Sequence, residues 1–398
     1  MNETAITPAA TVTHAAAATP AGNGGTPMTP RQYLDHLLAH MVHSEGSDLI
    51  IKENSAPLFR IHGDLLPAPY PKLTTEQAQA ICYSIISDRQ RETFEKNLEL
   101  DLAHEIPGLS RFRVNLMYQR GSVTGCLRAI PITIKTMEDL NLPAVCRYFC
   151  ERPRGLVLVT GPTGSGKTTS LAAMINYINE RMDVHIMTVE DPVEFVHEDK
   201  KALINQRELG TDTLSFANAL KYVLRQDPDV ILVGEMRDLE TISLAITAAE
   251  TGHLVFGTLH TTDAVQTVDR IIDVFPTHQQ QQVRMQMSVN LIGVVSQTLL
   301  KTADGRGRVA AFETMVAVPA IRNLIREAKT HQINSTIQTG ARQGMMTLDQ
   351  NLAELARKRM VSFEEAAAKA GNLQEFMNIY GEAVSQDELA AAQAARKR

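Results

Sequence analysis

The sequence lacks any continuous apolar stretch near the length of about 18 residues that a membrane-spanning helix needs. Its first thirty residues contain no lysine or arginine and no leucine-rich core, so we do not expect a secretory signal peptide. Cysteines are few, and the four that are present form no pair of CxxC motifs: Cys82, Cys126, Cys146 and Cys150. This excludes a disulfide scaffold and favours a reducing, cytoplasmic compartment.

Positive charge is in slight deficit, because 39 lysines and arginines stand against 45 aspartates and glutamates, which gives a formal net charge of −6. This mild acidity argues against a dedicated DNA-binding protein, so we expect no direct nucleic-acid partner. Hydrophobic residues make up 44% of the 398 residues, which is enough to build the cores of two or three domains.

The N-terminal third of the chain predicts a tail followed by a small domain. Residues 1–30 are rich in alanine, threonine, proline and glycine and are almost uncharged, so we expect a disordered tail. Residues 31–131 combine helical patterns with short strand candidates, which predicts a mixed α/β domain. In its clearest strand, 111–118, apolar residues alternate with polar ones, which places Arg111 and Arg113 on a basic outer face.

The pattern changes after a proline-containing stretch, 132–153, which we expect to be a linker. Four apolar runs without alternation are typical of strands buried on both faces of a parallel sheet: 155–161, 185–190, 229–235 and 253–260. Helical patterns separate these runs, so we expect a doubly wound α/β domain over 154–300. We expect a mostly helical region over 301–378 and a solvated tail over 379–398.

A phosphate-binding loop is predicted where GPTGSGKT fits the pattern GxxxxGK[ST], between a predicted strand and a predicted helix. Glycines let the backbone curl so that its N–H groups point at phosphate oxygens, and the helix N-terminus adds partial positive charge. Lys167 would reach the β- and γ-phosphates, and the Thr168 hydroxyl would bind Mg²⁺. The expected nucleotide-binding residues are Gly161, Pro162, Thr163, Gly164, Ser165, Gly166, Lys167, Thr168 and Thr169.

Acidic residues follow two of the predicted strands. Ligands bind at the carboxyl ends of the strands in such sheets, so Glu235 is the expected acid near Mg²⁺. Glu190 and Glu194 follow another strand, and either could polarise the attacking water. His253 and His260 bracket the run 254–259, where a histidine at a strand end could sense the γ-phosphate, although an ordinary core histidine is the plain alternative.

Taken together, four segments resemble the motifs of the secretion-type ATPases, the hexameric motors of type IV pili and type II secretion. GPTGSGKT, TVEDPVEF, DPDVILVGEMRDLET and TGHLVFGTLHTTDA would be the Walker A, Asp-box, Walker B and His-box motifs of this family. The similarity covers about 31–375. It implies a PAS-like N-terminal domain, a RecA-like P-loop domain with a helical C-terminal region, and hydrolysis of ATP with Mg²⁺. It also implies catalytic roles for Glu190, Glu194, Glu235 and His260.

A further segment resembles the AIRNLIRE signature of the pilus retraction branch of this family: Ala320, Ile321, Arg322, Asn323, Leu324, Ile325, Arg326 and Glu327. The resemblance implies a role in retraction rather than in nucleotide binding. The plain alternative is an amphipathic helix whose Arg322, Arg326 and Glu327 are merely solvated. The chain also lacks the tetracysteine zinc element usual in extension and type II secretion members, which favours the retraction branch.

The resemblance further implies a homohexamer at the cytoplasmic face of the inner membrane, which acts on the pilus platform protein. A paralogous accessory ATPase is a further candidate partner. Five arginines are candidates to reach the nucleotide of their own or the adjacent subunit: Arg111, Arg113, Arg225, Arg237 and Arg270. The alternatives are an extension or secretion motor of the same family, a weakly active accessory subunit, and a ring that translocates nucleic acid.

Overall fold

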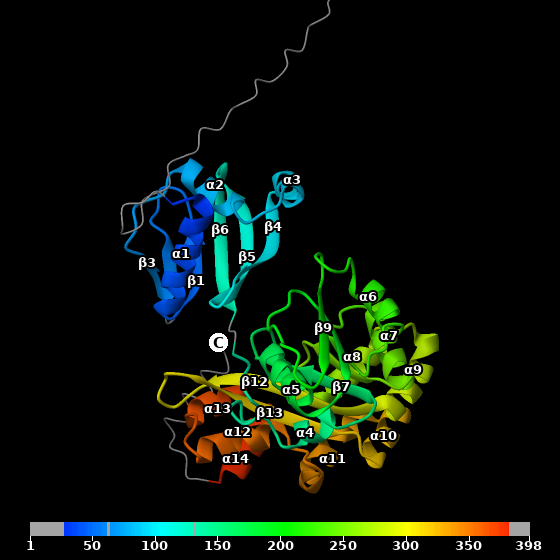
Figure 1. The fold of residues 1–398 in the computed structure, drawn as a ribbon. Coiled ribbons are helices and arrows are strands. Elements are labelled where there is room, and N and C mark those ends of the chain that lie inside the picture. The colour runs from blue at the N-terminus through cyan, green and yellow to red at the C-terminus, as the bar shows by residue number, and fades with distance from the viewer. Residues whose placement is uncertain (1–27, 62–63, 131–132, 382–398) are drawn as a thin grey trace, which may run out of the picture. The chain divides into compact units, whose positions relative to one another are not determined.

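The computed structural model describes residues 28–61, 64–130 and 133–381. It divides the chain into two compact units, with the boundary between residues 132 and 133 (Figure 1). Nearly all of the predicted N-terminal tail, and most of the predicted tail 379–398, lie outside the described residues. No helix in the described ranges is long and apolar enough to cross a membrane.

The first unit contains a sheet in the order β3-β2-β1-β6-β5-β4, and every neighbouring pair is antiparallel. Thr29 and Thr74 begin the first two helices with capping boxes, in which each threonine and a glutamine three residues later bond the backbone. The elements of this unit are α1 (Pro30–His43), β1 (Gly46–Ile51), β2 (Leu58–Ile61), β3 (Asp64–Pro67), α2 (Thr75–Tyr83), α3 (Asp88–Asn97), β4 (Glu99–Ile106), β5 (Ser110–Gln119) and β6 (Ser122–Ile130).

Strand β5 confirms the predicted alternation. The side chains of Phe112 and Val114 are fully buried in the core of the first unit, Arg113 is exposed, and Arg111 is half-buried. The strand is therefore buried on one face, as expected for an antiparallel sheet that covers its core with helices on one side only.

The second unit contains a sheet in the order β13-β12-β7-β11-β10-β8-β9, in which all neighbours are parallel except the β12–β13 pair. Its elements are α4 (Val145–Cys150), β7 (Gly155–Thr160), α5 (Lys167–Arg181), β8 (His185–Glu190), β9 (Leu203–Glu208), α6 (Phe216–Val223), β10 (Val230–Val233), α7 (Leu239–Glu250), β11 (Leu254–Leu259), α8 (Ala264–Asp273), α9 (Thr277–Asn290), β12 (Leu291–Lys301), β13 (Arg308–Val316), α10 (Pro319–Arg326), η1 (Thr330–Gln332), α11 (Ile333–Thr339), η2 (Ala341–Gln343), α12 (Leu348–Arg357), α13 (Phe363–Lys369) and α14 (Leu373–Tyr380).

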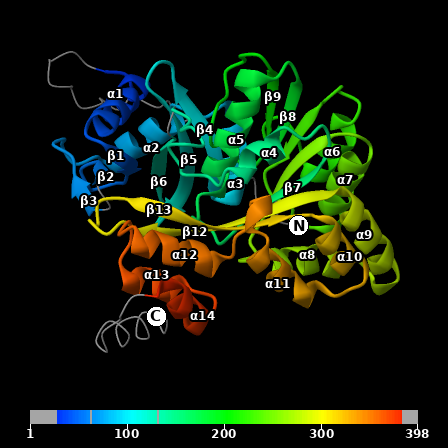
Figure 2. The same ribbon diagram turned by 90° about the horizontal axis from the view of Figure 1, so that it is seen from below.

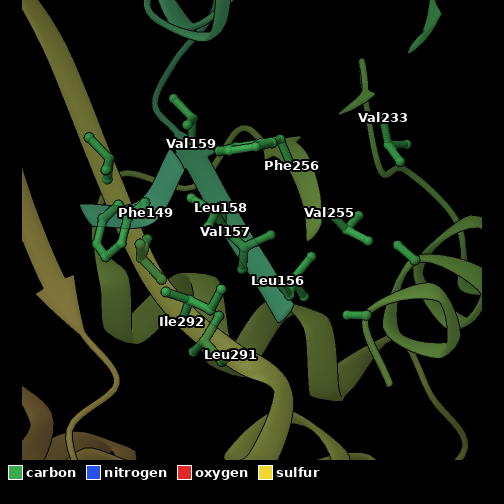
Figure 3. Packing of buried hydrophobic residues seen from close by; sticks show 14 of the residues in the cluster. Phe149, Leu156, Val157, Leu158, Val159, Val233, Val255, Phe256, Leu291 and Ile292 are labelled. Carbon is green, nitrogen blue, oxygen red and sulfur yellow. The ribbon is translucent and has the colours of Figure 1, made fainter. Parts of the chain in front are cut away.

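The central strands of this sheet are covered on both faces, because every residue of β7, β10 and β11 is buried. Figure 3 shows Leu156 and Val157 of β7 packed between the side chains of neighbouring strands, with Val255 on one side and Leu291 on the other. The four predicted parallel strands are thus confirmed. They place the carboxyl ends of β7, β8, β10 and β11 along one edge of the sheet.

Two expected boundaries differ from the structure. The stretch 132–153 is not a free linker, because α4 lies within it and buries Cys146, Phe149 and Cys150 completely in the core of the second unit. A helix this short does not complete two turns, so its periodicity is too weak to detect in the sequence. The region 301–378 is not helical from its start, because β13 extends the sheet beside β12 before the helices begin.

The helices at the C-terminal end of the second unit form a satellite core of their own. Leu352, Ala353 and Phe376 from α12 and α14 are fully buried, and they pack with Leu300 and Val309 of the β12–β13 hairpin. Figures 1 and 2 show α12, α13 and α14 gathered beside this hairpin. The mostly helical character predicted for the end of the chain therefore holds from α10 onward.

Candidate nucleotide-binding and catalytic site

The predicted phosphate-binding loop lies between β7 and the N-terminus of α5, as the sequence pattern requires. Gly161, Gly164 and Gly166 adopt φ angles of 143°, 77° and 89°, which residues other than glycine rarely adopt. Gly166 is the N-cap residue of α5, and Lys167 begins this helix. The loop therefore presents free backbone N–H groups and a helix N-terminus, which together form an anion-binding site.

Strand β12 contacts the phosphate-binding loop through Gln297. Gln297 donates a hydrogen bond from Nε2 to the carbonyl oxygen of Ser165 at 2.7 Å, and its own side chain is buried. A Cβ atom at Gly161 would lie 2.2 Å from the carbonyl oxygen of Gln297, so only glycine fits there. Sequence reasoning missed Gln297, although a glutamine inside the apolar segment 291–300 is a detectable signal.

The side chain of Lys167 lies over the loop that carries it. Its Nζ donates to the carbonyl oxygens of Gly161 at 2.8 Å and Pro162 at 3.2 Å. Burial lowers the pKa of this ammonium, and the negative charges of Glu235 and Glu194 oppose that shift. Lys167, Glu194 and Glu235 follow β7, β8 and β10, whose carboxyl ends lie along one edge of the sheet, so the three residues belong to one site.

Glu235 follows β10 and is held by two basic side chains. Its Oε2 accepts a hydrogen bond from Arg237 Nη2 at 2.6 Å, and its Oε1 lies 2.9 Å from His260 Nε2. The hydrogen bond from Arg237 is the largest cause that lowers the pKa of Glu235, and the charges of Arg237 and His260 act in the same direction. The carboxylate is thus ionised throughout the neutral range.

The two acids after β8 differ in their surroundings. Glu190 is buried, with only 6% of its surface exposed, and its Oε1 accepts hydrogen bonds from Thr188 at 2.6 Å and Gln206 at 3.1 Å. Burial raises the pKa of Glu190, so its charged form is disfavoured. Glu194 is half-buried in the loop after β8, and its negative charge acts to raise the pKa of Lys167.

A chain of hydroxyl groups joins the strand ends beneath the site. Thr160, the last residue of β7, lies 2.7 Å from Ser296 of β12 and accepts a hydrogen bond from Thr267 of α8 at 3.4 Å. Thr267 in turn lies 2.7 Å from Thr261, which follows His260. The loop after β11 is therefore fastened to the strand that carries the phosphate-binding loop.

The structure does not bring every candidate residue to this edge of the sheet. His253 precedes β11, at the opposite end of the strand from His260, and its Nδ1 lies 2.9 Å from the carbonyl oxygen of Ala248. Arg225 is exposed before the first residue of β10, also at the opposite edge. Arg270 is exposed in the last turn of α8. Arg111 and Arg113 belong to the first unit.

The segment 320–327 consists of α10 from its second residue onward and of Glu327, the C-cap residue, and its Arg322 contacts the end of α9. Ile321 and Ile325 are fully buried, while Arg326 and Glu327 are exposed. Arg322 is not merely solvated, because its guanidinium donates to the carbonyl oxygens of Ala317 at 2.7 Å and Ser288 at 2.8 Å, and also to that of Val289. The plain alternative was therefore wrong about this arginine, whose binding to backbone carbonyls the sequence does not reveal.

A glycine-rich loop between a buried strand and a helix, with a carboxylate at the end of a nearby parallel strand, defines a P-loop nucleoside triphosphatase. The chain belongs to the type II/IV secretion system protein family, whose model matches residues 30–396. It is 55% identical to a twitching motility protein of Neisseria gonorrhoeae over 316 residues, which is 79% of this chain and 84% of that protein.

The chain is also 52% identical to the type IV pilus retraction ATPase PilT of Pseudomonas aeruginosa over 337 residues, which is 85% of this chain and 98% of that protein. Among solved structures, a crystal structure of the pilus retraction motor PilT with bound ADP matches with a TM-score of 0.81 and 45% identity. The match covers 85% of this chain and 97% of that one. These similarities confirm the resemblance to the pilus retraction ATPases and the fold class expected from the sequence.

Proposed function

We propose that this protein is an ATP-hydrolysing motor that powers type IV pilus retraction and works as a homohexamer at the cytoplasmic face of the inner membrane. Its relatives bear the names of a twitching motility protein and a retraction ATPase, and both align over most of their length. One observation carries the catalytic part of the proposal: Lys167 lies on the phosphate-binding loop after β7, and Glu194 and Glu235 follow β8 and β10, whose carboxyl ends lie along the same edge of the sheet.

The residues at the loop fit a nucleoside triphosphate and Mg²⁺. The glycine conformations aim backbone donors at one point, and Lys167, whose ammonium has three donors, can bind phosphate oxygens. The Thr168 hydroxyl and the ionised Glu235 carboxylate are the hard oxygen donors that would hold Mg²⁺, directly or through water. When bound, Mg²⁺ neutralises charge that develops on the phosphate oxygens. Among the described residues no cluster of His, Cys, Asp or Glu could hold a metal ion on its own.

Of the two candidate bases, we favour Glu194. The carboxylate of Glu190 is buried and already bonded to Thr188 and Gln206, so it lacks the exposure needed to bind an attacking water. Glu194 would accept a proton from water as the water oxygen bonds to the γ-phosphorus. The bond from that phosphorus to the bridging oxygen then breaks, which releases ADP and phosphate.

The coupling of hydrolysis to movement would use the arginines. Arg237 stands beside Glu235 in the same subunit. Arg111, Arg113, Arg225 and Arg270 would have to reach the nucleotide of their own or a neighbouring subunit in the ring. Loss of phosphate would then release one arrangement of the two units in favour of another, provided that nucleotide states differ in affinity for the two arrangements. The pilus platform protein and a paralogous accessory ATPase are the proposed partners.

The test is phosphate release and mass measurement on the purified variant Lys167→Ala, with Lys221→Ala on the exposed end of α6 as the matched control. Loss of hydrolysis in Lys167→Ala with an intact hexamer supports the proposal, and turnover equal to the wild type contradicts it. A deletion strain with long pili that do not retract would separate retraction from extension or secretion. Binding to single-stranded nucleic acid that weakens steeply with salt would instead favour a translocating ring.

A further inference from the structure

The loop that carries Glu194 is fastened to β9 by two side chains. β9 lies next to β8 at the edge of the sheet, and the parallel register pairs Thr188 with Gln206 and Glu190 with Glu208. Gln206 and Glu208 are two residues apart, so both project to the same face of the strand. The chain between the two strands, 191–202, returns across this face.

Both polar atoms of the Gln206 side-chain amide form hydrogen bonds with this loop or with the end of β8. Its Nε2 donates to the carbonyl oxygen of Phe195 at 2.8 Å and to Glu190 Oε1 at 3.1 Å, and its Oε1 accepts from the backbone N–H of His197 at 2.8 Å. Two backbone groups of the loop and the last side chain of β8 therefore meet at one amide. Because the amide supplies both donors and an acceptor, neither a carboxylate nor an aliphatic side chain can replace it.

Glu208 binds the loop on the N-terminal side of Glu194. It is buried, with 6% of its surface exposed, and its Oε2 accepts a hydrogen bond from the backbone N–H of Val193 at 3.1 Å. The residues immediately before and after Glu194 are thus both bonded to β9. The side chains of Val193 and Phe195 are buried as well, so the backbone on both sides of Glu194 is fixed by packing and by hydrogen bonds.

We infer that Gln206, together with Glu208, is a positioning residue for hydrolysis: it clamps the segment 193–197 to β9 so that the Glu194 carboxylate faces the phosphate-binding loop. This inference rests on the proposed role of Glu194 as the base. It assigns a role to a strand that carries none of the P-loop, acidic or histidine motifs. Misplacing a catalytic group by about 1 Å is enough to reduce turnover on the order of 100-fold.

The experiment compares Gln206→Ala with Asn205→Ala in the purified full-length protein. Asn205 is exposed and contacts His185 rather than the loop, so its loss removes a side-chain hydrogen bond from the same strand without touching the clamp. Gln206→Ala is expected to lower kcat by about 10- to 100-fold while KM for ATP changes less than about twofold, because the phosphate-binding loop is intact. Asn205→Ala is expected to keep both constants.

The charged replacement Gln206→Glu adds a second measurement, the pH dependence of turnover, which a purely structural role of Gln206 would not change. In Gln206→Glu, the new carboxyl can accept from His197 but can donate to Phe195 or Glu190 only when it is protonated. Turnover relative to the wild type should therefore recover as pH falls, whereas Gln206→Ala should show no such recovery. Four titratable groups surround this position: Glu190, Glu194, Glu208 and His197. Gln206→Ala keeps all four, so a difference between the pH profiles of Gln206→Glu and Gln206→Ala is due to the new carboxyl.

Non-additivity separates failure of this inference from failure of the proposed base. If Gln206 acts through Glu194, then adding Gln206→Ala to Glu194→Gln should lower kcat no further. Wild-type turnover by Glu194→Gln would reject the base itself. Full loss in Glu194→Gln with normal turnover in both Gln206 variants would reject the clamp alone. If Gln206→Ala does not fold, the test is whether turnover of Gln206→Glu recovers as pH falls. Absence of this recovery also rejects the clamp.

Discussion

Arg237 donates a hydrogen bond to the carboxylate of Glu235, with Nη2 of the arginine 2.6 Å from Oε2 of the glutamate. His260 contacts the other oxygen, so the acid expected to serve Mg²⁺ is bound on both sides by basic groups. A cation that bound this carboxylate would therefore compete with Arg237 and His260 for its oxygens.

The first prediction concerns Glu235 itself. Glu235→Gln removes the negative charge while keeping the shape, so it should retain ADP binding and lose turnover on the order of 100-fold. Phosphate release and a fluorescent ADP titration measure the two effects. Glu240→Gln, on the exposed first turn of α7, is the matched control. Turnover near the wild-type value in Glu235→Gln would show that this carboxylate has no role in the reaction.

The second prediction separates the two histidines. His260→Ala removes a contact with the ionised Glu235 and should lower turnover by about 10-fold. His253→Ala removes a hydrogen bond to the carbonyl oxygen of Ala248 and a contact of 3.3 Å with the Thr251 hydroxyl, both remote from Glu235, so it should cost about 1 kcal/mol of stability and leave turnover unchanged. Steady-state kinetics and thermal unfolding of both variants check this. Equal kinetic effects in the two variants would contradict the different placement of the two side chains.

Much of the second unit was predictable because its signals are local. The buried strands are unbroken apolar runs, and the phosphate-binding loop is a contiguous pattern whose glycines need positive φ angles. The alternation in β5 was equally visible. These features depend on neighbours in the sequence, so they are readable before any tertiary contact is known.

The features that escaped prediction depend on contacts between distant residues. Strand β9, LINQRE, is polar and does not alternate clearly, so neither the strand nor the role of Gln206 and Glu208 could be recognised. The choice between Glu190 and Glu194 required knowing which carboxylate is buried against Gln206. The capping of α9 by Arg322 likewise joins residues more than 30 positions apart.

The third prediction follows from a buried acid in β13. Glu313 accepts a hydrogen bond from the backbone N–H of Ala264 at 2.8 Å, and burial raises its pKa to about 7. In the unfolded chain a glutamate has a pKa of about 4.3. The folded state therefore holds a proton that the unfolded state releases, so this contribution to stability is full below about pH 4.3 and is lost as pH rises through 7.

Glu313→Gln should flatten this dependence, because its amide keeps an acceptor for Ala264 and does not titrate. Relative to the wild type, the variant is expected to gain on the order of 1–3 kcal/mol in unfolding free energy between pH 5 and pH 8. Unfolding measured across this range, with the exposed Glu92→Gln on α3 as the control, tests it. Parallel pH profiles for Glu313→Gln and the wild type would show that Glu313 does not carry this proton.

The last prediction divides the segment 320–327 into a structural and a functional part. Arg322 binds carbonyl oxygens in the last turn of α9, where the helix dipole favours a cation, and burial lowers the pKa of its guanidinium. Arg322→Ala should therefore cost about 2–3 kcal/mol of stability. Arg326 is exposed, so Arg326→Ala should leave unfolding and turnover unchanged while abolishing twitching, if this face of α10 acts in retraction. Thermal unfolding, phosphate release and motility assays on both variants decide, and normal twitching in Arg326→Ala would remove this residue from the retraction surface.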